Sequence, residues 1–257
     1  MIKLKLEEIL ILDASTIEYV DDNKDIICQL KEILKIFGEI NELASWKKKD
    51  DYSNGIYLWI QNFYQYAREA YNNLVIGNLY SFYSGIRTVL ENRIYFEYIL
   101  KYKQENLLEK WMKYSYIKFI QEFPEAKEKE KNELLEEFIF DEGINEKKVN
   151  DYTWLKDLFS EKTYITIEKL CKKIDKMKLY KDYRDLSNYV HGQNHYVKTI
   201  PFTFYTSIHS KVIILVDAIV DYIELFSNEI TGYEYLFEMI SDKRNALCKK
   251  IQDSCLY

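Results

Sequence analysis

The sequence predicts an all-α fold, a bundle of about seven helices, from three observations. Glycine (7) and proline (2) are scarce among 257 residues, whereas a β-sandwich or barrel needs many turns that contain them. Long stretches carry apolar residues at three- and four-residue spacing, which is the period of an amphipathic helix. The chain is also long enough to bury a sizeable core, and 47% of its residues are hydrophobic, as in ordinary globular proteins.

The N-terminal part predicts a helix followed by a linker. Residues 1–20 fit either a short strand or the start of an amphipathic helix. Residues 21–46 have apolar side chains every three or four positions and predict a helix. The charged, turn-forming stretch "KKKDDYSNG" at 47–55 predicts a linker. We therefore divide the chain into an N-terminal helical extension packed on the core, residues 1–50, and a helical domain, residues 51–257, that includes the C-terminal helix.

The domain is expected to be helical up to the C-terminus, with extra N- and C-terminal helices around the central bundle. Residues 56–103 predict either one continuous helix or two helices with a break near Gly77. A helix over 105–123 is expected to stop near Pro124. Residues 124–152 read as a charged, solvated segment. The remaining expected helices are one or two within 164–192, one over 202–232 and one over 234–256.

Charge and composition exclude several classes of function. The formal net charge is −6, so any contact with nucleic acid needs a local basic patch. The longest strongly apolar stretch, 212–220, contains Asp217 and is too short to span a bilayer. The four cysteines lack CxxC spacing and follow no secretory signal, which predicts reduced thiols in a cytoplasmic protein and argues against a structural zinc site. These cysteines are Cys28, Cys171, Cys248 and Cys255.

The stretch "YRDLSNYVHGQNHYV", Tyr183–Val197, holds two of the three histidines and is the strongest functional signal. On one helix over 179–191, a packing stripe holds Leu179, Tyr183, Leu186 and Val190. A polar stripe beside it holds Arg184, Ser187, Asn188 and His191. Arg184 and His191 are two turns apart, about 10 Å along the axis, and point the same way.

Two readings of this pair are open. Gly192 predicts that His191 lies in the last helical turn, where the helix dipole favours the protonated imidazole needed for proton donation. Arg184 carries a permanent planar charge suited to a phosphate group. The structural alternative makes His191 a helix cap and pairs Arg184 with an acidic residue of a neighbouring helix.

A second polar pattern lies on the helix over 80–100. Arg87 and Glu91 are four residues apart and are expected to pair. In the functional reading, Glu91 lies near Arg184 or His191 and orients it. In the structural reading, the two form an ordinary intrahelical ion pair.

Four other residues of the helix over 80–100 carry expectations. Small Ser84 and Gly85 would allow a neighbouring helix to approach closely. Arg93 and Glu97 repeat the four-residue spacing on another face, which we expect to be solvent-exposed.

Residues around the polar stripe carry weaker expectations. Tyr189 lies on neither stripe and is a candidate for stacking on a base. His195 and Lys198 follow the stripe in sequence and are candidates for substrate contact, although His195 is the more easily read as incidental. Tyr183 and His209 are expected to be structural.

The segment "RDLSNYVH" resembles the signature of the HEPN superfamily (higher eukaryotes and prokaryotes nucleotide-binding). Arg184, Asp185 and His191 match its arginine, following polar residue and histidine, with six residues between Arg184 and His191. The upstream "YSGIRTVLENRIYFEYI", with Arg87 and Glu91, is similar to a branch of uncharacterised bacterial HEPN-like proteins. The resemblance covers roughly residues 52–222 and implies that the domain over 51–257 is a HEPN-like helical bundle.

The resemblance implies a metal-independent endoribonuclease that needs no cofactor. Its substrate would be RNA, and its site would be composite, formed where two protomers of a homodimer bring their Arg184 and His191 together. Arg184 and His191 would be catalytic, with Asp185, Ser187, Asn188, Glu91 and Arg87 supporting them. Members of the superfamily act in phage defence or as toxins, so an antitoxin or a defence-system protein is an expected partner.

A second function stays open. Other members of the superfamily have lost catalysis and serve as modules that bind a partner protein or a nucleotide. The acidic composition favours this alternative, whereas the intact Arg184, Asp185 and His191 favour the enzyme.

Overall fold

The computed structural model describes residues 14–45, 50–103, 106–122, 152–159, 164–190, 201–227 and 234–254. Within these ranges every regular element is a helix, which confirms the all-α prediction. The elements are α2 (Ala14–Asp22), α3 (Lys24–Ser45), α4 (Asp51–Val75), α5 (Leu79–Lys101), α6 (Leu107–Glu122), the 3₁₀ helix η3 (Thr153–Leu158), α8 (Ile167–Lys173), α9 (Met177–Val190), α10 (Pro201–Ser227) and α11 (Glu234–Ser254).

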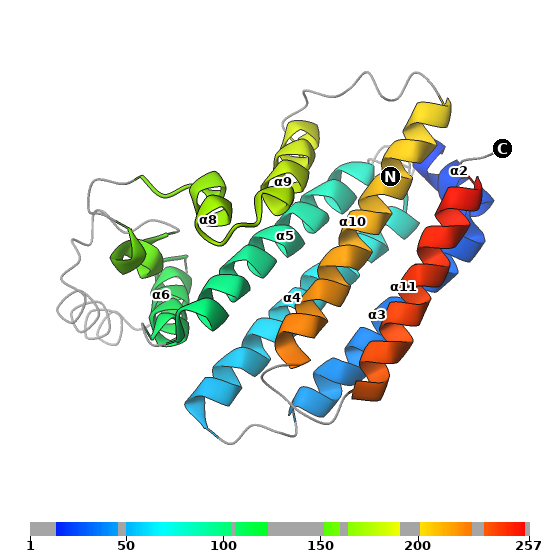
Figure 1. The fold of residues 1–257 in the computed structure, drawn as a ribbon. Helices are drawn as coiled ribbons and strands as arrows, with labels where there is room; N and C mark the ends of the chain where they lie inside the picture. The colour runs from blue at the N-terminus through cyan, green and yellow to red at the C-terminus, as the bar shows by residue number, and fades with distance from the viewer. Residues whose placement is uncertain are drawn as a thin grey trace, which may run out of the picture.

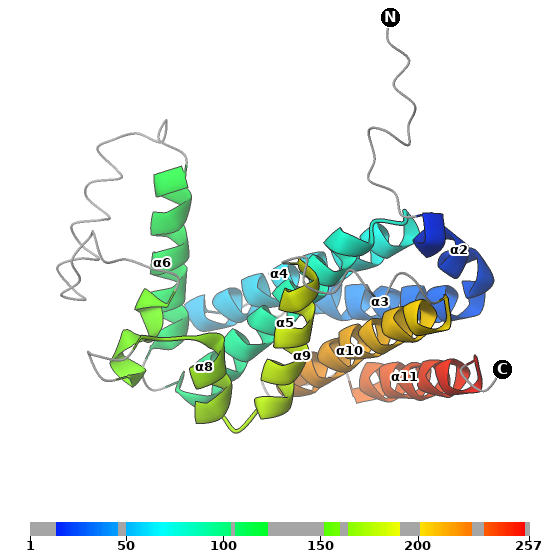
Figure 2. The same cartoon turned by 90° about the horizontal axis from the view of Figure 1, so that it is seen from above.

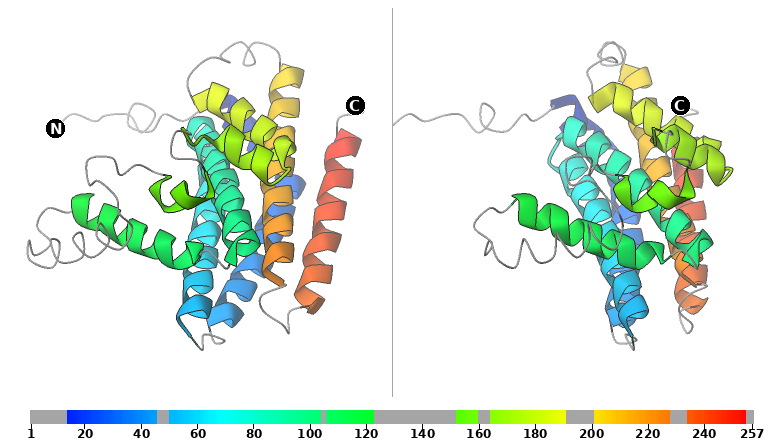
Figure 3. Two further views of the ribbon diagram at one scale, coloured as in Figure 1. Left: turned by 60° about the vertical axis from the view of Figure 1, so that its left-hand side comes forward. Right: turned by 90° about the vertical axis from the view of Figure 1, so that its left-hand side faces the viewer.

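The long helices form one bundle. Figure 1 shows α3, α4, α5, α10 and α11 running alongside one another, with α10 between α5 and α11. The shorter α8 and α9 pack on the outside of α5. Figure 2 shows α6 projecting from the bundle at the end away from α2, and the views in Figure 3 agree. The outer face of α5 therefore carries the helix that holds Arg184.

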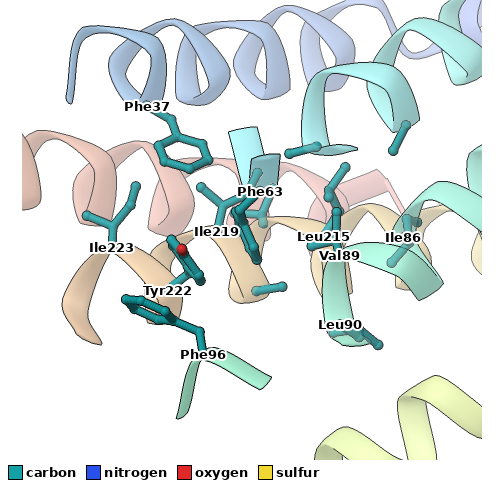
Figure 4. Close-up of a cluster of buried hydrophobic side chains, with 14 of the residues drawn as sticks. Phe37, Phe63, Ile86, Val89, Leu90, Phe96, Leu215, Ile219, Tyr222 and Ile223 are labelled. Carbon is teal, nitrogen blue, oxygen red and sulfur yellow. The ribbon is translucent and has the colours of Figure 1, made fainter. Parts of the chain in front are cut away.

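One apolar core joins these helices. In Figure 4, Phe63 of α4, Phe96 of α5 and Tyr222 of α10 meet, with Phe37 of α3 close by. The rings of Phe63 and Tyr222 stack at 3.7 Å, and those of Phe96 and Tyr222 lie 4.7 Å apart. Side chains of α3 belong to the same cluster as those of α4 to α11. The division of the chain at residue 50 stays a prediction.

Residues 56–103 form two helices with a break near Gly77, rather than one continuous helix. Gly77 has φ 79°, a left-handed conformation that glycine adopts without steric cost. Asn78 then caps α5, because its side chain accepts a hydrogen bond from the backbone of Ser81 at 3.0 Å. The turn lets α4 and α5 pack antiparallel. At their contact, a Cβ on Gly85 would lie 2.9 Å from that of Ala70, so the expected close approach at Gly85 is confirmed.

The predicted linker at 47–55 is wrong in its second half. Helix α4 begins at Asp51, and Asp50 and Ser53 form a capping box in which the Asp50 carboxylate accepts from the Ser53 backbone at 2.7 Å. Gly55 lies inside the helix, where a Cβ would come within 2.9 Å of the side chains of Leu108 and Met112. The turn-forming residues therefore serve as a helix cap and a close contact with α6.

The other expected helices lie close to their predicted bounds. Helix α6 ends at Glu122, as the proline at 124 predicts. The segment 164–192 holds two helices, α8 and α9. The charged segment 124–152 lies, except for Tyr152, outside the described residues. No helix in the described ranges is long and apolar enough to cross a membrane.

Candidate functional site on helix α9

Helix α9 packs against α5 with the stripe that the sequence predicts. Leu186 is fully buried and Leu179 is 6% exposed. Tyr183 and Val190, on the same stripe, are half-buried. The packing stripe is therefore confirmed, and it fixes which side of α9 faces solvent.

Arg184 is exposed on the far side of α9 from Leu186. Its guanidinium lies over the ring of Tyr180, 5.8 Å from the centroid. Among the described residues no carboxylate lies within ion-pair distance of it, so the structural reading in which Arg184 pairs with a neighbouring helix finds no partner there. Its charge is available to a ligand.

Arg87 of α5 makes polar contacts with two side chains of α9. Its Nε donates to the Ser187 hydroxyl at 3.1 Å, and its Nη2 donates to the Tyr183 hydroxyl. The guanidinium also lies over the Tyr183 ring, 4.6 Å from the centroid. Burial and the nearby Glu91 raise the pKa of Tyr183, although Arg87 opposes them, so the phenol stays protonated. These contacts clamp the middle of α9 to α5.

Glu91 contacts its own helix in the described residues, and whether it lies near His191 stays a prediction. It pairs with Arg87 at 3.7 Å, which confirms the predicted ion pair, and it accepts a hydrogen bond from the Tyr95 hydroxyl at 2.8 Å. None of its contacts in the described part of the chain is with Arg184. Arg87 is the residue that reaches α9, and Glu91 orients Arg87 rather than Arg184.

Asp185, the polar residue after the arginine, ties α9 to α10. Its carboxylate accepts from Lys211, whose side chain is 5% exposed. The sequence contains no periodic signal that would pair these residues, because 26 positions separate them. Within the polar stripe, Ser187 and Asn188 are both partly exposed, and only Ser187 receives the Arg87 contact.

Four of the predicted site residues lie wholly or partly outside the described residues. His191, His195 and Lys198 lie outside the described residues, and so does the side chain of Tyr189, although its backbone belongs to α9. His191 directly follows Val190, the last residue of α9, in the sequence. Its approach to Arg184 stays a prediction.

The expectation that Arg93 and Glu97 face solvent is wrong. Arg93 is 6% exposed and Glu97 is 8% exposed. Arg93 pairs with Asp221 of α10 at 2.7 Å and with Glu97 at 3.4 Å. The face that carries them is covered by α10 and by Lys176, whose amine lies 3.8 Å from Glu97. A four-residue spacing does not reveal which face a tertiary neighbour covers.

The one histidine within the described ranges, His209, is structural, as expected. His209 is 4% exposed, and its Nε2 lies 3.2 Å from the Asn23 side-chain oxygen. Burial lowers its pKa to about 4, so it is neutral at physiological pH. Cys28, Cys171 and Cys248 are free thiols. No group of three or more His, Cys, Asp or Glu side chains in the described ranges is placed to hold a metal ion.

The comparison with protein families gives one match. Residues 53–199, more than half of the chain, match a family of unknown function, DUF5677. The chain belongs to this family. The DUF5677 region runs from the first turn of α4 beyond α9, so it contains Arg87, Glu91, Arg184 and His191. No curated protein and no protein of solved structure matches the chain.

Proposed function

We propose that this DUF5677 protein is a metal-independent endoribonuclease of HEPN type that acts in the cytoplasm in phage defence or in a toxin–antitoxin system. One observation carries the proposal: Arg184 is exposed and has no carboxylate partner in the described part of the chain. An arginine left unpaired on a clamped helix, seven residues before a histidine, is suited to a phosphate ligand.

The reaction assigned to these residues is an internal transfer at one phosphate. The ribose 2′-oxygen forms a bond to the adjacent phosphorus, and the bond from phosphorus to the 5′-oxygen breaks. His191 takes the proton of the 2′-hydroxyl or gives one to the leaving 5′-oxygen. Arg184 stabilises the negative charge of the phosphorane. The products are a 2′,3′-cyclic phosphate and a 5′-hydroxyl, and the reaction consumes no metal or cofactor.

The site is proposed to be shared by two protomers. Seven residues along a helix separate Arg184 and His191 by about 10 Å, too far for both to reach one scissile phosphate easily from the same chain. In a homodimer, Arg184 of one protomer lies near His191 of the other. The Arg87 clamp on Ser187 and Tyr183 supports this geometry because it fixes the rotation of α9 about its own axis.

The test is cleavage of a mixed RNA pool in EDTA by wild type, His191→Ala, Arg184→Ala and Lys249→Ala. Lys249 is an exposed lysine of α11, and its variant controls for a contaminating nuclease. We expect wild type and Lys249→Ala to leave cyclic phosphate ends. The two motif variants should cleave at least about 100-fold more slowly. Absence of cleavage by folded, dimeric wild type, together with equal growth of cells that express wild type or His191→Ala, would contradict the proposal.

The alternative is a catalytically inactive HEPN-like module that binds a partner protein or a nucleotide. The Asp185–Lys211 ion pair favours it, because the polar residue of the motif then serves the packing of α9 on α10. In that case Arg184→Ala would weaken binding of the partner without changing any cleavage.

A further inference from the structure

Positive charge is concentrated on α8 and α9 of a protein that is acidic as a whole. Residues 168–184 contain seven Lys or Arg residues and only three Asp or Glu residues, and all seven cations are exposed. The whole chain has a net charge of −6. This segment is therefore a local basic patch of the kind that contact with a phosphate backbone would need.

The cations of this patch differ in their partners. Lys176 lies 3.8 Å from Glu97. Lys178 lines a cavity of about 220 Å³ with Asp182. Burial raises the pKa of Asp182, and Lys178 opposes that rise, which places the lysine charge close to the carboxylate. Lys181, by contrast, is exposed and has no ion pair with any residue in the described ranges.

Lys181 lies in the same row of α9 as Arg184. The row runs Lys181, Arg184 and Asn188, with spacings of three and four residues, which keep side chains on one face of a helix. The buried Leu179 and Leu186 mark the opposite face. Lys181 lies one turn before Arg184, about 4.5 Å along the axis.

We propose that Lys181 binds the RNA phosphate next to the one that Arg184 contacts, so that the strand follows this row along α9. The inference rests on the proposed function in taking RNA as the ligand. A lysine supplies a mobile point charge that tolerates varied strand conformations, whereas the planar Arg184 fork suits the reacting phosphate. Two cations one helical turn apart, Lys181 and Arg184, can each meet one of two successive phosphates of a nucleic acid strand.

The test measures binding apart from cleavage. A fluorescein-labelled oligouridine is titrated at several salt concentrations with the His191→Ala protein, alone or with Lys181→Ala or Lys249→Ala added. Lys249 is the matched control, since it is exposed on α11, across α10 from α9 (Figure 1). We expect Lys181→Ala to weaken binding about fivefold and to reduce the slope of log K against log salt by about 0.7, while Lys249→Ala changes neither. All variants should keep the same melting temperature.

The outcomes separate this inference from the ribonuclease. If oligouridine binding depends on Lys181 and wild type does not cleave RNA, the proposal that Lys181 binds RNA is supported and the proposed ribonuclease activity is wrong. If wild type cleaves RNA and the Lys181 and Lys249 variants bind oligouridine with equal affinity, the ribonuclease proposal is supported and the proposed role of Lys181 is wrong. A labelled oligoglutamate serves as a second probe. If it binds through Lys181 while oligouridine does not bind, the row recognises an acidic peptide and the inference is wrong.

Discussion

Helix α5 carries two arginine–glutamate pairs with the same four-residue spacing and opposite surroundings. The Arg87 and Glu91 side chains are 30% and 23% exposed, whereas those of Arg93 and Glu97 are 7% and 8% exposed. Six residues further along a helix is about two thirds of a turn around its axis, so the two pairs face different neighbours.

The two pairs also have different tasks. Arg87 reaches across to Ser187 and Tyr183 on the helix of the candidate site. Arg93 is held between Glu97 and Asp221 and joins α5 to α10. The comparison teaches that the same pair of residue types positions a candidate site on one face and bridges two core helices on the other.

Replacement of Arg93 should have the largest effect on stability. Arg93→Met leaves the buried Glu97 without its closest cation, since Lys176 is farther away at 3.8 Å. We expect a loss of about 3 kcal/mol in the free energy of unfolding. Urea denaturation followed by circular dichroism measures it.

A double variant separates the lost ion pair from lost packing. Arg93→Met with Glu97→Leu removes the uncompensated charge as well and should recover part of the loss. If Arg93→Met were no more destabilising than the same change at Arg87, the contrast between the two pairs would be wrong.

Replacement of Arg87 should have a smaller effect on stability and a distinct effect on function. Arg87→Met removes the hydrogen bonds to Ser187 and Tyr183 in a partly exposed setting, so we expect a loss of about 1 kcal/mol. Because the clamp sets the rotation of α9, kcat for RNA cleavage should fall while the affinity for oligouridine changes little. Unchanged kcat would limit Arg87 to a structural role.

Neutralising the glutamate of each pair should give the smallest effect and the finest contrast. Glu91→Gln keeps an acceptor for the Tyr95 hydroxyl and loses only a partly screened ion pair, at a cost of about 0.5 kcal/mol or less. Glu97→Gln leaves the buried Arg93 with Asp221 alone and should cost more. Parallel urea curves at low and high salt measure both, and equal costs would contradict the burial difference.

Much of the fold could be predicted because it follows from local pattern. The scarcity of Gly and Pro and the apolar spacing predict helices, and the spacing of Leu179 and Leu186 predicts the buried side of α9. At Gly77 the sequence left two alternatives, because a single glycine is compatible with either a bend or a continuous helix. In the structure Gly77 has a left-handed φ of 79°, and the helix is broken there.

The sequence predicted which residues belong to the candidate site, but it predicted fewer of the contacts that they make with neighbouring helices. Arg184, Ser187 and Asn188 follow from helical spacing, and so does the Arg87–Glu91 pair. Helical spacing alone places Lys181 on the same face of α9 as Arg184. Whether its charge is free to bind a ligand depends on which lysines of residues 168–184 lie near a carboxylate, and spacing does not reveal that. Lys211, which holds Asp185, had no signal in the sequence, because its contact joins two helices 26 positions apart.

The sequence by itself determined the helices, the amphipathic character of α9 and the row that carries Arg184, because these depend on residues three or four positions apart. Only the tertiary structure decided that Arg87 clamps α9, that Arg93 and Glu97 are buried, and that Arg184 and Lys181 lack carboxylate partners among the described residues. The physical reason is that burial and pairing depend on which helix covers which face, and that choice is made by the packing of the whole core.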